Sequence, residues 1–258
     1  MLFDLDKKDT LIIIPARGGS QRVPNKNLRI LNNQPLIVHS IRECLKIKNA
    51  MTIVSTDNQN IAEISSQNGA LIPFIRPKNL SKSNSSSRSV MIHSLNYFYK
   101  KYKKLPLMVG LKPPTNPFIK SSSIQEIINK LKHSNHKINS CVSITEANTH
   151  PFRIISFEKD STIKNGIISI GNQTINDIER SQDWPKSWEG SPAFRLTKTT
   201  YFVEEVFNNN FEVIGKTYDY KNSIGFEISN FEAFDIDVEF DLKIAQSLAS
   251  MNDMNISA

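Results

Sequence analysis

The feature that most constrains the fold is a regular alternation of strand-like and helix-like segments over residues 11–144. Short apolar runs, several of them rich in β-branched side chains, predict buried strands at residues 11–14, 51–55, 71–74, 105–111 and 138–144. Apolar residues that recur every three or four positions predict helices at residues 34–46, 60–68, 86–99 and 121–133. Strands that alternate with helices at this spacing favour βαβ units, so we expect an α/β fold with a mostly parallel sheet.

Single residues mark where these elements begin, end or face inward. Ile37, Ile41 and Leu45 recur every four residues and should share the inner face of the first helix. Gly69 stands where the second helix should end, because glycine is favoured just beyond a helix C-terminus. Pro73 interrupts the strand predicted at residues 71–74 and weakens that prediction.

The second half of the chain loses this rhythm. Residues 148–190 are polar and predict no strong helix, with short strand candidates at residues 153–157 and 166–170. We expect an inserted β-rich lobe, or an arm for a partner subunit, within a single domain of residues 1–258. Regular structure should resume at residues 193–196, 199–207 and 223–228, and a final helix is predicted over residues 240–250.

Composition limits the classes of function. The net charge of +7 comes from scattered lysines and arginines, with one dense cluster at residues 100–104 that is typical of a solvated helix face. This charge suits small anionic substrates, whereas a nucleic-acid-binding role would depend on charge alone. No apolar run approaches the roughly 18 residues of a membrane span, and the first ten residues do not resemble a signal peptide. Cys44 and Cys141 lie far apart in apolar surroundings, which favours reduced thiols and a cytoplasmic protein.

The strongest local feature directly follows the first predicted strand and reads PARGGSQRVPNKN over residues 15–27. Gly18 and Gly19 allow a tight turn that points backbone N–H groups at an anion. Arg17, Arg22 and Lys26 supply the positive charge that a triphosphate needs. The loop has neither a G-K-[ST] ending nor a G-x-G-x-x-G pattern, so it matches neither of the two common phosphate-binding motifs. The alternative interpretation is a glycine turn with cations at the surface. Three cations so close together favour a phosphate-binding loop.

A pair of aspartates lies near the other end of the chain. Asp235 and Asp237 are two residues apart, so in an extended segment their carboxylates face the same side. Two such oxygen ligands can hold Mg²⁺ together with phosphate oxygens. The alternative, that Asp237 caps the following helix, has about equal weight on spacing alone.

The chain resembles the acylneuraminate cytidylyltransferases (CMP-sialic acid synthetases) in six stretches that occur in the same order as in that family. The loop at residues 15–27 is similar to the family signature I-P-A-R-G-G-S-K-x-x-x-x-K-N. The other five stretches are Ser55-Thr56-Asp57, Ile75-Arg76-Pro77 with Ser85-Ser86-Ser87, Pro114-Thr115-Asn116-Pro117, Arg180-Ser181-Gln182-Asp183-Trp184-Pro185 and Phe234-Asp235-Ile236-Asp237. The resemblance covers about residues 10–250, and the combination is more specific than any one stretch.

The resemblance implies a Rossmann-like cytoplasmic enzyme in which the anomeric hydroxyl of an α-keto sugar acid attacks the α-phosphorus of CTP and pyrophosphate leaves. It also implies a homodimer formed through residues 148–190, with no nucleic-acid or membrane partner, and a role in lipopolysaccharide or capsule biosynthesis. The catalytic residues it implies are Arg17, Lys26, Asp235 and Asp237, the last two as Mg²⁺ ligands. The nucleotide-binding residues it implies are Ala16, Arg17, Gly18, Gly19, Lys26, Asn27, Arg76, Ser85, Ser86 and Ser87. The sugar-binding residues it implies are Thr115, Asn116, Arg180 and Gln182.

Several departures from the family pattern bear on the acceptor. Gln21, Pro113 and Ile119 stand where the family has lysine, glutamine and arginine, and Ser191-Pro192-Ala193 replaces N-G-A. Lys112 and Lys120 flank two of these positions and are candidates to replace the missing groups. Because the changes fall mainly on sugar-recognition positions, we expect an acceptor such as legionaminic or pseudaminic acid rather than N-acetylneuraminate. Another nucleotide or acceptor, or a nucleotide-binding homologue without catalysis, remain as alternatives.

Overall fold

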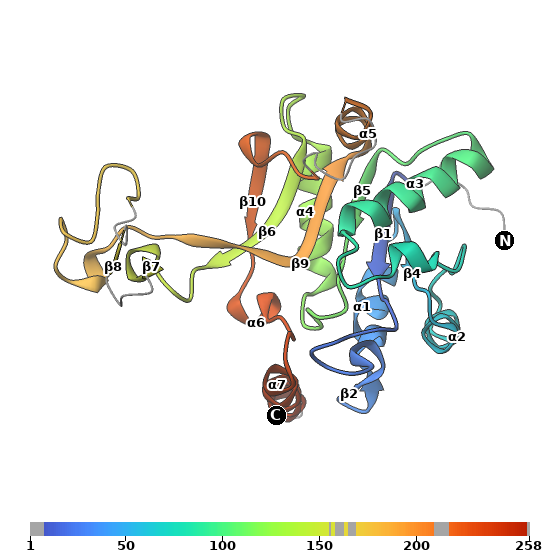
Figure 1. Cartoon of the computed structure of the whole chain (residues 1–258), viewed down its shortest axis with the longest axis horizontal. Coiled ribbons are helices and arrows are strands. Elements are labelled where there is room, and N and C mark those ends of the chain that lie inside the picture. Colours follow the sequence, from blue (N-terminus) through green and yellow to red (C-terminus); the bar gives the residue numbers. More distant parts are fainter. Residues whose placement is uncertain (1–7, 155, 158–162, 165–168, 209–216, 257–258) are drawn as a thin grey trace.

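The computed structural model describes residues 8–154, 156–157, 163–164, 169–208 and 217–256, and they form an α/β structure around one mixed sheet (Figure 1). The six strands lie in the order β10-β6-β9-β5-β1-β4. Their bounds are β1 (Thr10–Pro15), β4 (Ala50–Ser55), β5 (Met108–Leu111), β6 (Ser140–Glu146), β9 (Trp188–Lys198) and β10 (Ser223–Glu227). β1 pairs in parallel with both β4 and β5, and β10 pairs in parallel with β6. β9 is antiparallel to β5 and β6 and joins the two parallel sets.

Helices cover both faces of the sheet, because β1 points its apolar side chains alternately to each face. Ile12 and Ile14 belong to a core packed by α1 (Leu36–Leu45) and α4 (Ser121–Lys132). Leu11 and Ile13 belong to a second core packed by α3 (Ser87–Tyr102) and α5 (Thr199–Asn208). Each of these fully buried side chains stabilises the fold by roughly 1.5–3 kcal/mol relative to exposure. A run of four consecutive buried apolar residues is therefore what a doubly covered central strand requires.

A third apolar cluster joins the two ends of the chain. Val23, from the loop that follows β1, packs with Ile236 and with Leu242 of α7 (Glu239–Ile256). The short helix α6 (Asn230–Ala233) immediately precedes this segment. Burial of Val23 and Ile236 in one cluster fixes the loop beside the aspartate pair, although more than two hundred residues separate them in sequence.

Most of the predicted elements are confirmed, and several differ in their bounds or burial. Gln34–Pro35 forms β3 in a small hairpin with β2 (Ile30–Leu31), so α1 begins only after Pro35, whose backbone is extended (φ −55°, ψ 138°). Leu45, predicted to face inward, is 44% exposed because it lies at the end of α1. The strand predicted at residues 71–74 is reduced to an isolated bridge between Leu71 and β4, since Pro73 cannot continue a ladder.

The helix that follows β4 and both cysteines agree with the sequence. α2 (Gln59–Gln67) ends before Gly69, which has a positive φ of 89° that glycine adopts without strain. Cys44 and Cys141 are buried free thiols. In the part of the chain that the structure describes, no helix is long and apolar enough to cross a membrane.

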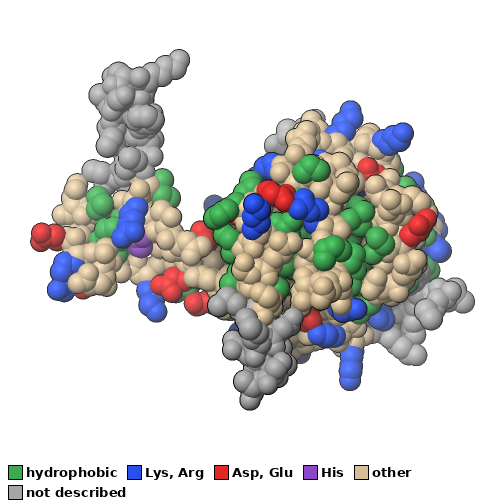
Figure 2. Space-filling model, turned by 90° about the horizontal axis from the view of Figure 1, so that it is seen from below, with side chains coloured by type: hydrophobic (Ala, Val, Ile, Leu, Met, Phe, Trp, Pro, Cys, Tyr) green, Lys and Arg blue, Asp and Glu red, His purple; other side chains and the backbone are tan. Residues whose placement is uncertain are grey.

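The described residues between 148 and 190 form a lobe that extends from the sheet beyond the start of β9 (Figure 1), and Figure 2 shows it standing clear of the main body. Its described regular structure includes a hairpin of β7 (Ser156–Phe157) and β8 (Ile163–Lys164). Most of the strand predicted at residues 166–170 lies outside the described residues. β9 begins earlier than the predicted 193–196, because Trp188, Glu189 and Gly190 pair with the end of β6 across a register shift. The lobe is therefore connected to the sheet through a strand that they share.

Candidate active site

The loop after β1 is held by its backbone at the carboxyl edge of the sheet. The N–H of Ala16 donates to the carbonyl of Ser55 at the end of β4 (2.9 Å), and the amide of Asn27 donates to the carbonyl of Arg17 (3.0 Å). The N–H of Gly18 donates to Oδ1 of Asp57 (3.0 Å). A Cβ at Gly18 would lie 2.9 Å from Cβ of Asn58, whereas nothing lies within 4 Å of one at Gly19. The first glycine is required by packing, and the second faces open space.

Lys26 turns inward and binds the aspartate segment. Its side chain is only 9% exposed, and Nζ donates to the carbonyl of Ile236 (2.6 Å) and lies 3.7 Å from Oδ1 of Asp237. Burial lowers the pKa of Lys26, and the charges of Asp237 and Asp235 partly oppose that effect. Asn25 has a left-handed backbone (φ 53°) that directs the chain inward just before it. Lys26 therefore connects the first and last motifs of the chain.

Asp235 and Asp237 differ in what they bind. The hydroxyl of Thr115 donates to Asp235, but Oδ1 of Asp235 is buried with no hydrogen-bond partner in the structure. Burial raises the pKa of Asp235, and the charge of Asp237 raises it further. Asp237 instead receives two hydrogen bonds from Arg22, at 2.9 and 3.2 Å. The carboxylate that accepts the N–H groups at the start of α7 belongs to Asp241, so the structure gives no support to Asp237 as the helix cap.

The donor set of this pair fits Mg²⁺. The ion prefers oxygen ligands and commonly binds proteins through one or two carboxylates, with water and substrate phosphates completing its octahedron. The orphaned oxygen of Asp235 is an acceptor that a cation would satisfy. Asp237 lies close enough to influence the pKa of Asp235, but its oxygens are paired with Arg22, so a shared ion would have to displace that arginine. Asp235 thus offers an unpaired acceptor to a cation, whereas Asp237 could do so only after Arg22 leaves it.

The turn after β5 positions Asp235. The carbonyl of Thr115 accepts the N–H of Ile236 (2.8 Å). The amide of Asn116, which is fully buried, donates to the carbonyls of Ala233 and Phe234, each at 3.1 Å. In this conformation Asn116 acts as a positioning residue, and its predicted contact with a sugar stays a prediction, as does that of Thr115.

Lys112 does not replace a missing surface group in this structure. Its side chain is 0% exposed, and Nζ donates to Oγ of Ser40 and to the carbonyls of Pro113 and Asn116, at 2.7–2.9 Å. These bonds hold the turn on the core. Ile119, which stands where the family has arginine, is fully buried in the core packed by α1 and α4.

Asp57 and Arg76 form a second polar group beside the loop. Arg76 is 4% exposed; its Nη2 lies 3.8 Å from Oδ1 of Asp57, and its Nε and Nη2 have no hydrogen-bond partner in the structure. Burial lowers the pKa of Arg76; the negative charge of Asp57 raises this pKa in part, and the positive charge of Arg17 lowers it further. Asp57 thus connects Arg76 to the N–H of Gly18. The sequence placed Asp57 after a strand but gave it no role.

The predicted serines lie at the start of α3. Oγ of Ser86 accepts the N–H of Ser89 and caps the helix (3.1 Å), and the hydroxyl of Ser85 donates to the carbonyl of Asn79 (3.3 Å). Ser86 and Ser87 line a cavity of about 580 Å³. A separate cavity of about 400 Å³ includes Asp235 in its lining. The site thus combines buried cations, a carboxylate with an orphaned oxygen and room for small molecules.

Comparison with known proteins identifies the family to which this arrangement belongs. The family model described as Cytidylyltransferase matches residues 11–162, more than half of the chain. The chain belongs to the cytidylyltransferase family. It is 29% identical to the CMP-N,N'-diacetyllegionaminic acid synthase of Legionella pneumophila over 251 residues, 94% of this chain and 97% of that protein. It is 27% identical to a pseudaminic acid cytidylyltransferase of Campylobacter jejuni over 207 residues, 76% of this chain and 82% of that protein. A solved structure of CMP:2-keto-3-deoxy-manno-octonic acid synthetase complexed with CTP has the same fold, with a TM-score of 0.66 at 12% identity over 95% of this chain and 100% of that one.

The two sugar-binding residues predicted in the lobe of this cytidylyltransferase do not line the Asp235 cavity. Arg180 pairs with Asp183 (2.7 Å), and Gln182 lines a cavity of about 430 Å³ at the base of the lobe. Asn148 lines both this cavity and the one that contains Asp235. Gln182 therefore lines a neighbouring cavity, and the sugar-binding roles of Arg180 and Gln182 stay predictions.

Proposed function

We propose that this cytidylyltransferase transfers CMP from CTP to the anomeric hydroxyl of a nine-carbon α-keto sugar acid of the sialic, legionaminic or pseudaminic type. The observation that carries the proposal is the orphaned, buried oxygen of Asp235, which lies in the segment that Lys26 binds. The names of the two relatives point to the same class of acceptor.

The reaction forms one bond and breaks one. The anomeric oxygen of the sugar acid bonds to the α-phosphorus of CTP and gives up its proton to water, while the bond from that phosphorus to the bridging oxygen breaks. Pyrophosphate leaves with the electron pair. Such transfers depend mainly on positioning the reactants and on neutralising negative charge, so no protein nucleophile is required.

Cationic side chains of the loop would bind the phosphates. Arg17, Arg22 and Lys26 lie on one loop, and Lys26 is held against the aspartate segment. Arg22 is paired with Asp237 at the surface, where such a pair is worth at most about 1 kcal/mol. A triphosphate, with more negative charge than one carboxylate, would attract Arg22 away and release Asp237. Asp235 and Asp237 would then hold Mg²⁺, which when bound neutralises phosphate charge and polarises the reacting phosphorus.

The nucleoside part of CTP would lie near the second polar group. Arg76 has guanidinium nitrogens without partners and a position fixed by Asp57. Asn27 and the segment Ala16–Gly19 shape the adjacent loop, and Ser85, Ser86 and Ser87 precede or begin α3. We therefore assign these residues to CTP binding, and Thr115, Asn116, Arg180 and Gln182 to the surroundings of the sugar.

The lobe at residues 148–190 would bind a second copy of the chain in the cytoplasm. It projects from the main body and exposes large apolar side chains, namely Ile154, Ile175 and Trp188. If these side chains form one patch, a partner chain would cover them, because contiguous exposed apolar patches mark interaction sites. Light scattering of the intact protein should give twice the mass of one chain, and a monomer would contradict this assignment.

Pyrophosphate release from CTP and Mg²⁺ tests the proposed reaction. The acceptors would be N-acetylneuraminic, legionaminic, pseudaminic and keto-deoxyoctulosonic acids, and Asp235→Ala would be the inactive control. We expect release with legionaminic or pseudaminic acid and its loss in the variant. Equal release from another nucleoside triphosphate would refute the preference for CTP. Best activity with N-acetylneuraminate would refute the proposed acceptor.

A further inference from the structure

Lys112 is a fully buried lysine that directly follows β5 and precedes the turn at residues 113–117. Its ammonium has three N–H donors, and three oxygen atoms accept from Nζ. They are Oγ of Ser40 on α1 (2.9 Å) and the carbonyls of Pro113 (2.7 Å) and Asn116 (2.8 Å). Because these acceptors match its donors in number, the ammonium has none left for a ligand. Lys112 therefore acts through the groups that it holds.

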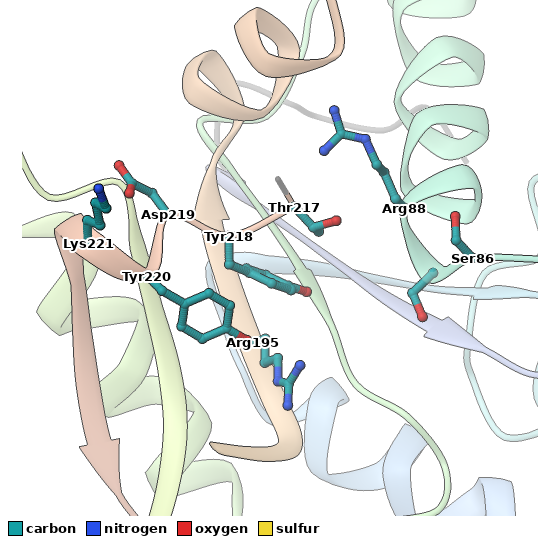
Figure 3. Close-up of a pocket in the computed structure, with 9 residues that line it drawn as sticks. Ser86, Arg88, Arg195, Thr217, Tyr218, Asp219, Tyr220 and Lys221 are labelled. Atoms are coloured by element: carbon teal, nitrogen blue, oxygen red, sulfur yellow. The ribbon is translucent and has the colours of Figure 1, made fainter. Parts of the chain in front are cut away.

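Arg88 is a buried cation of a different kind. It is 3% exposed, and its Nε, Nη1 and Nη2 have no hydrogen-bond partner in the structure. Figure 3 shows it extending from α3 beside the cavity of about 580 Å³, which Arg195 of β9 also lines. Its guanidinium lies over the ring of Phe202 on α5, 5.3 Å from the ring centre. Replacing Arg88 would therefore remove a buried charge without breaking a hydrogen bond.

The turn at residues 113–117 holds the peptide groups on both sides of Asp235. The carbonyl of Thr115 accepts the N–H of Ile236, which follows Asp235 in the chain (2.8 Å). The side-chain amide of Asn116 donates to the carbonyls of the two residues that precede Asp235, at 3.1 Å each. A shift of this turn would therefore move the carboxylate of Asp235 with it.

Asn116 links Lys112 directly to the aspartate segment. Its carbonyl accepts from Nζ of Lys112, while its amide binds the peptide groups before Asp235. Lys112 also acts on Asp235 through its charge. Burial raises the pKa of Asp235, and the positive charge of Lys112 is among the effects that oppose this rise. Lys112 thus favours the ionised carboxylate that a divalent cation needs.

A lysine is a costly residue with which to hold this turn. Burial lowers the pKa of Lys112 to about 8, so the group is still charged at neutral pH although it lies in the core. Buried charged groups can often be replaced by apolar groups of similar shape without loss of stability. The charge is therefore better explained by what it does to Asp235 than by a gain in stability.

We propose that Lys112 is a positioning residue for the cytidylyl transfer, because its buried ammonium fixes the turn that holds Asp235 where a divalent cation can bind. Without the ammonium, two carbonyls of the turn lose their buried donor, and the turn should rearrange to find another. The inference rests on the proposed function for the metal-binding role of Asp235. The contacts that join Lys112, the turn and the aspartate segment do not depend on that role.

The first test detects the positioning without metal or substrate. Hydrogen exchange of the Ile236 N–H, measured by NMR in EDTA, reports on its bond to Thr115. In Lys112→Met we expect this exchange to be about 10- to 100-fold faster, as for loss of hydrogen bonds to a charged group. The N–H of Val54, bonded to the carbonyl of Leu71 (2.9 Å), is the internal reference for a change in global stability. An Ile236 rate that rises no more than the Val54 rate would overturn the proposal.

The second test measures the metal site without turnover. With saturating CTP and no acceptor, the Mg²⁺ concentration that gives half of the thermal stabilisation should rise about 10-fold or more in Lys112→Met. The Kd for CTP in EDTA should stay at the wild-type value, since Lys112 contacts none of the residues assigned to the nucleotide. Arg88→Met is the matched control, because it also removes a buried cation, and it should leave the Mg²⁺ titration unchanged.

Ser40→Ala provides a milder variant should Lys112→Met not fold. It removes one acceptor of the ammonium and keeps its charge, so both readouts should change in the same direction by a smaller factor. No change in either readout would overturn the proposal.

The two readouts together separate the positioning role from the proposed reaction. Faster Ile236 exchange with a weaker response to Mg²⁺ supports the positioning role, and the same result in a protein that transfers no CMP refutes only the reaction. Faster exchange with an unchanged Mg²⁺ titration overturns the proposal, because the turn would then be structural. A wild type that does not respond to Mg²⁺ overturns it together with the metal-binding role of Asp235.

Discussion

Replacement of Asp235 by asparagine should stabilise the metal-free protein while abolishing its response to Mg²⁺. Oδ1 of Asp235 is buried without a partner, and burial raises the pKa of the carboxyl group. A raised carboxyl pKa favours folding only at low pH, and this contribution is lost as pH rises through the pKa of the folded state, so the ionised carboxylate destabilises the folded protein. An unsatisfied buried acceptor costs about 1–3 kcal/mol.

The expected gain is smaller than that cost, because the charge also has favourable partners. Lys26 and Lys112 attract the carboxylate, and Thr115 donates a hydrogen bond to it. Asparagine keeps an acceptor for Thr115 but loses the attraction to both lysines. We therefore expect a net increase of about 1 kcal/mol in the free energy of unfolding, or roughly 2–4 °C in Tm for a domain of this size.

Calorimetric melting in EDTA, and then with Mg²⁺ and CTP, measures both effects. Wild type should gain stability when metal and nucleotide are added, by mass action on the folded state. Asp235→Asn should begin at a higher Tm, gain less from Mg²⁺ and release no pyrophosphate. The reasoning is refuted if the variant melts below wild type in EDTA, or if Mg²⁺ stabilises both proteins equally.

Three further predictions follow from individual contacts. Gly18→Ala should lower the free energy of unfolding by about 1–3 kcal/mol, because the new Cβ would lie 2.9 Å from the side chain of Asn58, which caps α2. Gly19→Ala is the matched control for packing, since nothing lies within 4 Å of its Cβ. It should leave Tm unchanged but raise the KM for CTP. Arg22→Gln should change stability by less than about 1 kcal/mol but lower the half-saturating Mg²⁺ concentration, since it frees Asp237; an unchanged Mg²⁺ titration would show that the ion pair does not compete. Burial lowers the pKa of Lys112 from 10.5 to about 8, so between these two pH values the folded protein binds fewer protons than the unfolded chain. The free energy of unfolding should therefore rise from about pH 8 to pH 10.5, by at most about 3 kcal/mol. Denaturant titrations of the wild type and of Lys112→Met, which lacks the titrating group, measure this rise.

The sequence predicted the fold well where the spacing of apolar residues alone determines which side chains are buried. The helical stripe Ile124, Ile127, Ile128 and Leu131 is buried on α4 as its spacing requires. β1 and β4 lie within one residue of their predicted bounds, because doubly covered strands are apolar throughout. Agreement was weaker where local conformation decides, as at Pro35, which delays the start of α1.

Other features depended on contacts between distant segments. The sequence left open whether β9 runs parallel or antiparallel, and its pairing with both β5 and β6 fixes the direction. The sequence indicated that Lys112 could replace a missing polar group of the sugar site. Its position directly after β5 instead places it in the core, where its Nζ donates hydrogen bonds to Ser40 and to the following turn. Arg88 and Arg195 carried no motif signal, because an arginine in a helix or strand usually faces solvent.

The sequence by itself determined the kind of chemistry. Two glycines among cations indicate phosphate binding, and two aspartates two residues apart are suited to Mg²⁺, because turn geometry and ligand type are local properties of the chain. Only the tertiary structure decided which groups meet. Packing of Val23 against Ile236 brings the loop to the aspartates, and the hydrogen bond from Lys26 to Ile236 connects them. Burial also left one oxygen of Asp235 unpaired, and burial depends on neighbours that are distant in sequence.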